Sequence, residues 1–240
     1  MEYGLQLYSV NSRFNLDPDE ALRRVAEMGY DYVEFCTYAD RSMEEIKALL
    51  EKHKLGAIGT HQPIELLMDD AIENTIKDLK TLGLDKFIIP IVRIPYKEAI
   101  EIINKAQPIL EANGISLHYH NHASEFSPAE DGVIPYFAYV DQTNVNFEVD
   151  ILYVSVSGYD PLEFIKKLGK RVTLIHFKDG DAKAPYNATD FGKGEIDIPA
   201  IHKYAVENGI PMICEPGPRC VEEIYPLATS AINYMRSLDK

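Results

Sequence analysis

The sequence predicts an α/β fold, a closed parallel (β/α)8 barrel, on three observations. Eight short apolar or alternating segments read as strands, and helical patterns separate most of them. Each return to the next strand is short enough for a right-handed crossover, which is typical of parallel barrels. The competing open sheet lacks its nucleotide-binding signatures, since no Gly-x-Gly-x-x-Gly follows the first strand and no Gly-x-x-x-x-Gly-Lys occurs. The length of 240 residues suits one such barrel, so we expect a single domain over residues 1–240.

The elements follow one another in a regular order along the chain. Strands are predicted at residues 3–10, 32–35, 57–60, 86–91, 115–120, 145–149, 172–177 and 212–215. Helices are predicted from Asp17, from Ser42, and at 68–82, 96–112, 133–139, 161–168 and 221–238. Asp17 before Pro18 is a helix start, Ser42 opens a capping box, and residues from Asn11 are expected to form a polar loop.

Charge and cysteine content disfavour several kinds of partner and site. Lysine and arginine number 24 against 38 aspartates and glutamates, and the net charge of −14 disfavours nucleic acid and anionic membrane surfaces as partners. The first residues carry no basic leader, and no segment is apolar enough to span a membrane, so we expect a soluble, cytoplasmic protein. The cysteines, Cys36, Cys214 and Cys220, form no Cys-x-x-Cys pair, which argues against a disulfide framework and a structural zinc cluster.

The fifth predicted strand carries an unusual run of histidines. His118 and His120 share one face because side chains alternate along a strand, and His122 and Glu125 follow in the loop. Such a strand can simply form hydrogen bonds inside a core, but this many metal-capable side chains at one strand end favour a site.

Active sites of parallel barrels lie at the carboxyl ends of the strands. Four such positions, on the last four strands, are His120, Asp150, His176 and Glu215. Two imidazoles and two carboxylates suit a divalent metal such as Mn²⁺, Co²⁺, Fe²⁺ or Zn²⁺. The simpler alternatives are a helix cap for Asp150 and a salt bridge for Glu215, and each is credible on its own.

The chain resembles the sugar phosphate isomerase/epimerase superfamily, the xylose isomerase-like TIM barrels that include inosose dehydratases, ketose 3-epimerases and endonuclease IV. The matching motifs are Leu-Gln-Leu-Tyr-Ser at 5–9, Tyr-His-Asn-His at 119–122 with Glu-Phe at 125–126, Glu-Val-Asp at 148–150, His-Phe-Lys-Asp at 176–179, Gly-Lys-Gly-Glu-Ile-Asp at 192–197 and Cys-Glu-Pro at 214–216. The resemblance implies one metal held by a residue on each of the last four strands. Many members have a Glu on strand five where this chain has His120, and His118 is a second candidate for that position.

The expected chemistry is removal of a proton beside a metal-chelated carbonyl to form an enediolate, which leads to isomerisation or epimerisation of a sugar. We nominate Glu215, His61 and Lys178 as catalytic residues, with a salt bridge to Asp179 or Asp181 as the alternative role of Lys178. The residues expected to bind a sugar or keto-sugar substrate are Gln6, Glu34, His118, Glu125, Glu195 and Arg219. Because no phosphate cradle is evident, an uncharged substrate is favoured.

Other functions remain open at this stage. The main rival is a lyase or dehydratase that acts on a 3-keto sugar, keto-glycoside or inosose by β-elimination. A sugar-binding barrel without turnover and a repair nuclease are the others, and the negative charge disfavours the nuclease. Residues 180–191 are expected to form a lid, a subunit contact or passive surface, and association into a homo-oligomer is an expectation by analogy only.

Overall fold

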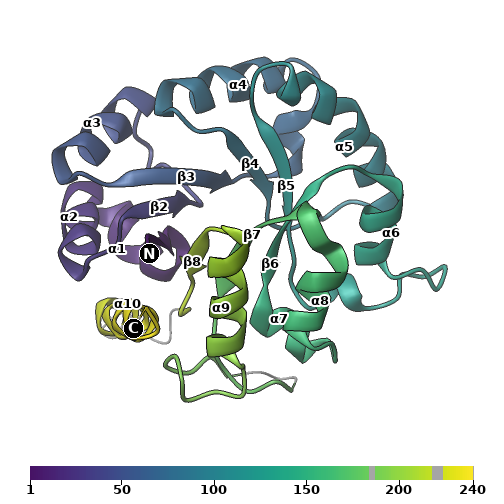
Figure 1. Ribbon diagram of the computed structural model, residues 1–240. Helices are drawn as coiled ribbons and strands as arrows, with labels where there is room; N and C mark the ends of the chain where they lie inside the picture. Colours follow the sequence, from purple (N-terminus) through teal and green to yellow (C-terminus); the bar gives the residue numbers. More distant parts are fainter. Residues whose placement is uncertain (184–186, 218–223, 240) are drawn as a thin grey trace.

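The computed structural model describes residues 1–183, 187–217 and 224–239, and its strands close into a parallel barrel in the order β1 to β8 (Figure 1). The strands are β1 (Tyr3–Gln6), β2 (Tyr32–Phe35), β3 (Gly56–His61), β4 (Lys86–Ile89), β5 (Ser116–His120), β6 (Asn146–Asp150), β7 (Val172–Phe177) and β8 (Met212–Cys214). The prediction of a closed (β/α)8 barrel is therefore confirmed.

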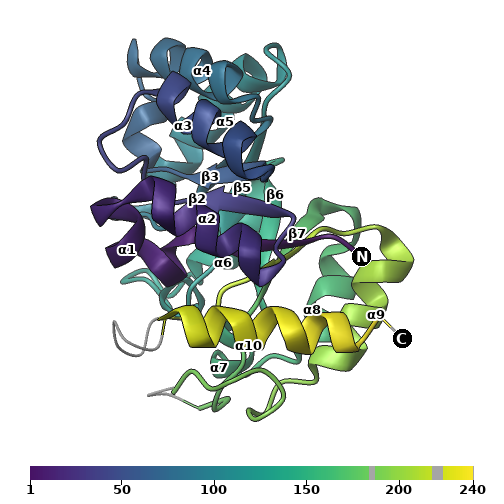
Figure 2. The same cartoon turned by 90° about the vertical axis from the view of Figure 1, so that its left-hand side faces the viewer.

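Helices surround the strands, as Figure 1 shows. They are α1 (Asn11–Leu16), α2 (Pro18–Met28), α3 (Met43–His53), α4 (Ala71–Leu82), α5 (Tyr96–Glu111), α6 (Pro135–Gln142), α7 (Ile151–Val156), α8 (Pro161–Leu168), α9 (Ile198–Asn208) and α10 (Ile224–Ser237). The two ends of the chain lie near each other (Figure 2), and the Tyr3 hydroxyl donates a hydrogen bond to Asp239 Oδ1 at 2.6 Å. None of the helices within the described ranges has the length and apolar character that crossing a membrane requires.

The local signals that predicted helix starts act as expected. Asp17 caps α2, because its side chain accepts a hydrogen bond from the backbone N–H of Glu20. Ser42 and Glu45 form the reciprocal capping box at the start of α3. Gly29 ends α2 with φ of 94°, a left-handed conformation that glycine adopts without a steric penalty.

Some element boundaries differ from the prediction. The first strand ends at Gln6, and residues from Leu7 form a 3₁₀ turn followed by α1, where a polar loop was expected. Phe14 explains the difference, since it is fully buried and holds α1 against the core. Helices α7 and α9 had not been predicted, and residues 221–223 of the last predicted helix lie outside the described residues.

The barrel interior is divided into an apolar floor and a polar upper layer. Ile88, Leu174 and Ile213 are fully buried and pack with Tyr32 at the floor. Gly4 makes room for the Tyr32 ring, because a Cβ at Gly4 would lie 2.2 Å from a ring carbon.

Strand register sets the level of the polar side chains above this floor. Gln6 pairs with Glu34, His120 with Glu148, and Asp150 with His176. The polar side chains from β1, β2, β5, β6 and β7 therefore gather in one layer.

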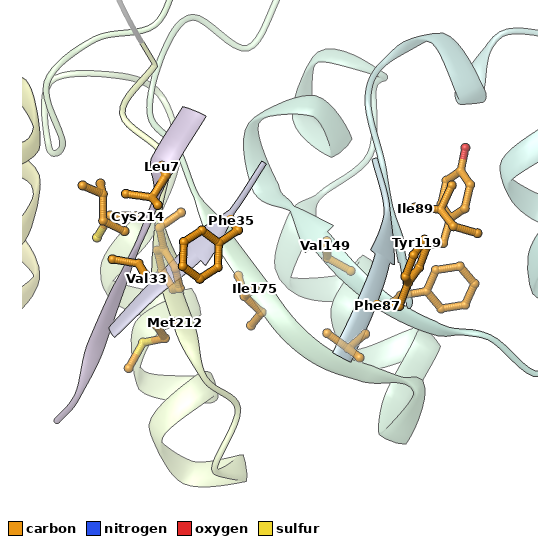
Figure 3. Packing of buried hydrophobic residues seen from close by; sticks show 14 of the residues in the cluster. Leu7, Val33, Phe35, Phe87, Ile89, Tyr119, Val149, Ile175, Met212 and Cys214 are labelled. Atoms are coloured by element: carbon orange, nitrogen blue, oxygen red, sulfur yellow. The ribbon is translucent and has the colours of Figure 1, made fainter. Parts of the chain in front are cut away.

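The outer faces of the strands pack against the helices. Phe87 and Ile89 of β4 lie beside Tyr119 of β5 (Figure 3), and all of them are fully buried. This alternation places apolar side chains outside the barrel wall and leaves the inward positions of the same strands free for polar groups.

The loop after β7 is organised by one carboxylate. Asp179 is 1% exposed and accepts backbone N–H groups from Gly180 at 2.9 Å, Gly192 at 2.8 Å and Gly194 at 3.0 Å. Gly194 must be a glycine there, because a Cβ would lie 2.1 Å from Asp179 Oδ1. The glycine-rich motif at 192–197 thus wraps around a buried carboxylate.

We expect Asp179→Asn to loosen this loop, because the amide nitrogen cannot accept the N–H groups that face the lost oxygen. The free energy of unfolding should fall by about 3 kcal/mol, measured by urea denaturation, with faster amide exchange in the loop. Asp181→Asn is the control, since Asp181 is exposed and accepts a single side-chain bond from Asn187. Equal stability of the two variants would contradict this account.

Candidate active site

A cavity of about 1030 Å³ opens at the carboxyl ends of the strands. Its lining comprises Tyr8, Cys36, His61, Gln62, Pro63, Pro90, Ile91, Arg93, His120, His122, Tyr153, Lys178, Asn187, Ala188, Glu215 and Gly217. This volume is ample for a monosaccharide, since small-molecule pockets typically measure about 300–1,000 Å³.

The four residues predicted as metal ligands converge. His120, Asp150, His176 and Glu215 are buried, and each offers a ligand atom within 4.8 Å of the others. His176 Nδ1 lies 3.1 Å from Glu215 Oε2. They come from the ends of β5, β6 and β7 and from the residue after β8, so the barrel wall itself brings them together.

Asp150 combines the capping role and an open ligand position. Its Oδ1 accepts the N–H of Tyr153 at 3.0 Å and caps α7, while its buried Oδ2 accepts no hydrogen bond from the described residues. Asn121 holds the backbone of Asp150 from the neighbouring strand, accepting its N–H at 3.1 Å and donating to its carbonyl at 3.3 Å. The unsatisfied buried oxygen is what a cation ligand would present.

Lys178 brings a positive charge into the same group. Its Nζ lies 3.3 Å from Glu215 Oε2 and 3.8 Å from Asp150 Oδ2, and it sits over the Tyr153 ring. The side chain is buried among these partners and also lines the cavity. The predicted alternative was a salt bridge to Asp179 or Asp181. The carboxylates that Lys178 contacts here are those of Asp150 and Glu215, which places it at the site.

A second buried group lies next to the first and shares its histidines. His61, His120, Glu148 and His176 also have ligand atoms within 4.8 Å of one another. His61 Nε2 lies 2.6 Å from Glu148 Oε2 and 3.0 Å from Glu34 Oε2. The Glu34 and Glu148 side chains are fully buried, so the imidazoles supply their compensating partners.

These contacts shift the acidities of the buried groups. Burial opposes protonation of His61, but Glu34 and Glu148 outweigh it and raise its pKa to about 9. Burial favours the neutral form of Glu34, yet His61 and His176 hold the pKa of Glu34 well below its usual range. Burial raises the pKa of Glu148, and the nearby Glu34 adds to the effect. The carboxylates of Glu34 and Glu148 thus differ in acidity although both are fully buried.

The groups near the cavity differ in the same way. Burial raises the pKa of Asp150 to about 6, although Lys178 acts in the opposite direction. Burial also opposes ionisation of Glu215, but Lys178 and His176 hold its pKa well below the usual range. Burial raises the pKa of the Cys36 thiol to about 12, which leaves it protonated and a poor nucleophile.

His118 lies inside the barrel but is not part of either group. Its Nε2 is 2.8 Å from the Ser116 hydroxyl and its Nδ1 is 3.1 Å from the Thr173 hydroxyl. Burial lowers the pKa of His118 to about 3. Both ring nitrogens are thus engaged by hydroxyls one layer below His120.

The remaining predicted substrate-binding residues are dispersed. Gln6 donates to Glu34 Oε2 at 2.6 Å beneath the cavity. Glu125 lines a separate cavity of about 650 Å³ between the loops after β4 and β5, and it accepts the backbone N–H of His122. Glu195 is exposed and accepts the N–H of Ala182, while Arg219 lies outside the described residues.

Several cavity residues had been given no specific role from the sequence. His122 and Tyr153 face the cavity with their rings in contact, 4.9 Å between centroids. Tyr8 and Arg93 also line it, and Glu148 lies below. Glu148 carried a signal, because it shares the inward face of β6 with Asp150, two residues away.

Comparison with known proteins identifies relatives of this fold. A family described as xylose isomerase-like TIM barrel matches residues 22–238. A sugar phosphate isomerase/epimerase from Parabacteroides distasonis has a similar structure, with a TM-score of 0.77, 23% identity, and coverage of 97% of this chain and 92% of that one. Among curated proteins, no match was found.

Two other solved structures illustrate the range of activities on this fold. A D-allulose 3-epimerase from Methylomonas sp. has a TM-score of 0.72 at 13% identity and covers 99% of this chain and 98% of its own. A probable 3-DHS dehydratase from Bacillus anthracis has a TM-score of 0.72 at 15% identity, covering 100% and 99%. At these identities the likeness extends to the fold alone.

We expect Asn121→Ala to destabilise the site, because it leaves the buried N–H and carbonyl of Asp150 without their partners. The free energy of unfolding should fall by about 2–4 kcal/mol, measured by urea denaturation. Asn104→Ala is the control, since the exposed Asn104 donates one bond to the carbonyl of Gln142. A loss no greater than that of the control would show that the Asn121 bridge contributes little.

Proposed function

Because the chain belongs to the xylose isomerase-like TIM barrel family, we propose that it is a divalent-metal-dependent sugar isomerase or epimerase. One observation carries the proposal: His120, Asp150, His176 and Glu215 offer ligand atoms within 4.8 Å of one another at the end of the barrel. A protein that only bound sugar would have no evident use for this set of buried groups.

The donor set fits a divalent first-row metal. Two imidazole nitrogens and two carboxylates match the preferences of Mn²⁺, Co²⁺, Fe²⁺ and Zn²⁺. The Oδ2 of Asp150 supports the same assignment. The described residues donate no hydrogen bond to it and the Lys178 ammonium group lies 3.8 Å away, and a buried carboxylate oxygen without a hydrogen bond is costly in a folded protein. His120, Asp150, His176 and Glu215 would hold the ion.

The bound cation would supply the positive charge that stabilises an enediolate formed from a hydroxy-carbonyl substrate. The residues of the chain supply the proton transfers. Glu215 and His61 both line the cavity and come from different strands, so we assign them the removal and return of the proton at carbon. Lys178 would hold a substrate oxygen through its ammonium group.

A neutral sugar or keto-sugar is the proposed substrate. The cavity of about 1030 Å³ has room for one, and its lining mixes aromatic rings with hydrogen-bonding groups such as Tyr153 and Asn187. The net charge of −14 disfavours a strongly anionic ligand.

A lyase or dehydratase acting on a 3-keto sugar, keto-glycoside or inosose is the alternative. Lys178 favours it, because its Nζ lies 3.3 Å from Glu215 Oε2, so a proton donor stands beside a candidate base. After the same α-proton has been removed, a donor at this position could protonate a departing β-hydroxyl or alkoxide, and β-elimination would follow.

We expect one divalent metal per purified chain, measured by elemental analysis after incubation with Mn²⁺, Co²⁺ or Zn²⁺. Asp150→Ala and His176→Ala should lose it, since each removes a ligand. His118→Gln is the matched control on β5, because His118 is also a buried histidine but lies one layer below His120, and this variant should retain the metal. Wild-type protein that binds none of these ions would refute the metal-dependent mechanism. Loss of the metal in the His118 variant as well as in the other two would make His118 the candidate ligand on β5.

Deuterium incorporation then tests the reaction. We expect the loaded enzyme to exchange the α-proton of at least one ketohexose or keto-sugar in D₂O, followed by NMR. Glu215→Gln should reduce exchange by at least about 100-fold if Glu215 transfers the proton. Epimeric or isomeric products would support the main proposal, whereas an unsaturated product would favour the lyase. Unchanged exchange in the Glu215 variant would remove that residue from the mechanism.

A further inference from the structure

We propose that Glu148 and Glu34 position the metal-binding histidines and that the site therefore holds one ion, although two overlapping sets of candidate ligands are present. This inference rests on the proposed metal site and adds the residues that orient its ligands. Within the described residues, His120 and His176 belong to both sets, so an ion bound by either set would use the same two imidazoles.

His176 is held between the two groups by its two ring nitrogens. Nδ1 faces Glu215 Oε2 at 3.1 Å, and Nε2 faces Glu34 Oε2 at 2.7 Å. A neutral imidazole carries one N–H and one lone pair. If the Nε2–H donates to Glu34, the Nδ1 lone pair is directed to the side where Glu215 lies.

His120 is oriented by the other inner carboxylate. Its Nδ1 lies 3.0 Å from Glu148 Oε2, which leaves Nε2 as the nitrogen for a ligand. His61 completes the arrangement, because its Nε2 contacts the same Glu148 oxygen at 2.6 Å. His176 Nε2 lies 3.2 Å from the same oxygen, so one Glu148 oxygen contacts three imidazoles. A carboxylate behind a metal-binding histidine is a common way to fix its tautomer and raise its basicity.

The two shortest contacts of Glu148 and Glu34 with the histidines fit hydrogen bonds and are too short for two ligands of one ion. Two ligand atoms that are each about 2.1 Å from one ion lie about 3.0 Å apart at a right angle and about 3.4 Å apart in a tetrahedron. The inner contacts from His61 to Glu148 at 2.6 Å and from His176 to Glu34 at 2.7 Å are shorter than either. The contact between His176 and Glu215, at 3.1 Å, lies within that range, as do the contacts of His120 and His176 with Glu148, at 3.0 and 3.2 Å.

Glu34 is itself held from below. Gln6 Nε2 donates to Glu34 Oε2 at 2.6 Å, and Gln6 Oε1 accepts the backbone N–H of Tyr8 at 3.0 Å. Glu34 is therefore anchored to β1 and cannot shift easily towards the cavity. Such fixed partners suit an orienting role, since they hold each imidazole in one rotation.

The test combines metal titration with the wild type and two isosteric variants, Glu148→Gln and Glu34→Gln. We expect one Zn²⁺ per wild-type chain by calorimetry against a competing chelator. Each variant should still bind one ion, with affinity reduced about 10- to 100-fold. Glu125→Gln is the matched control, because Glu125 is a buried carboxylate in the other cavity, and its Zn²⁺ affinity should equal that of the wild type.

Nitrogen-15 NMR of the Zn²⁺-loaded wild type reports which ring nitrogen of each histidine carries the proton. A merely structural role of Glu34 and Glu148 would not determine this position. We expect His176 to carry its proton on Nε2 and His120 to carry its proton on Nδ1. This measurement needs no variant, so it decides the question even if a substitution prevents folding. The opposite tautomer at both histidines would overturn the proposal.

The outcomes separate this inference from the proposed function. Two ions per wild-type chain, or unchanged Zn²⁺ affinity in both Glu148→Gln and Glu34→Gln, would overturn the positioning role. The protein could still be a metal-dependent enzyme. Wild-type protein that binds no Zn²⁺, Mn²⁺ or Co²⁺ would overturn the metal-dependent function and this inference together.

Discussion

The pairing of charge inside the barrel is the constraint on which the rest of the structure depends. Glu34, Glu148 and Asp150 have fully buried side chains, and an unpaired carboxylate in such surroundings would cost several kcal/mol. The His61 imidazole lies at hydrogen-bond distance from Glu148, and that of His176 from Glu34. The ammonium group of Lys178 lies 3.8 Å from Asp150 Oδ2. Removing one partner would leave a buried charge uncompensated, so the polar layer must be maintained as a unit.

Parallel closure makes this layer possible without weakening the core. The outward side chains of the same strands, such as Phe87 and Tyr119, supply the apolar contact with the helices. The interior floor of Ile88, Leu174 and Ile213 separates the polar layer from the amino-terminal end of the barrel. Stability and chemistry are therefore carried by opposite faces of the same strands, as the alternation of side chains allows.

The sequence was sufficient to predict the barrel and the convergence of the last four strands. Alternation along each strand and the position of each strand end were enough to bring His120, Asp150, His176 and Glu215 together. Alternation alone could not separate His118 from His120, because they share a face and differ only in depth. Depth depends on strand stagger, which is a property of the closed barrel and not of one segment.

The same reason explains why Glu148 received no role. The sequence also did not indicate which cavity Glu125 would line. A 3₁₀ turn after β5 directs Glu125 to the backbone of His122, away from the large cavity, and no local pattern encodes that direction.

The charges of the two overlapping sets of candidate ligands also explain why His120 can occupy the ligand position at the end of β5. With His120 neutral, the outer set contributes the negative charges of Asp150 and Glu215, which a divalent ion would balance. Glu34 and Glu148 are then paired with histidines. The pKa of His61, raised to about 9, is the consequence of that pairing. A carboxylate in place of His120 would stand beside Glu148, whose Oε2 lies 3.0 Å from His120 Nδ1, and like charges would meet in a dry interior. The imidazole at position 120 and the buried acid at position 148 therefore depend on each other.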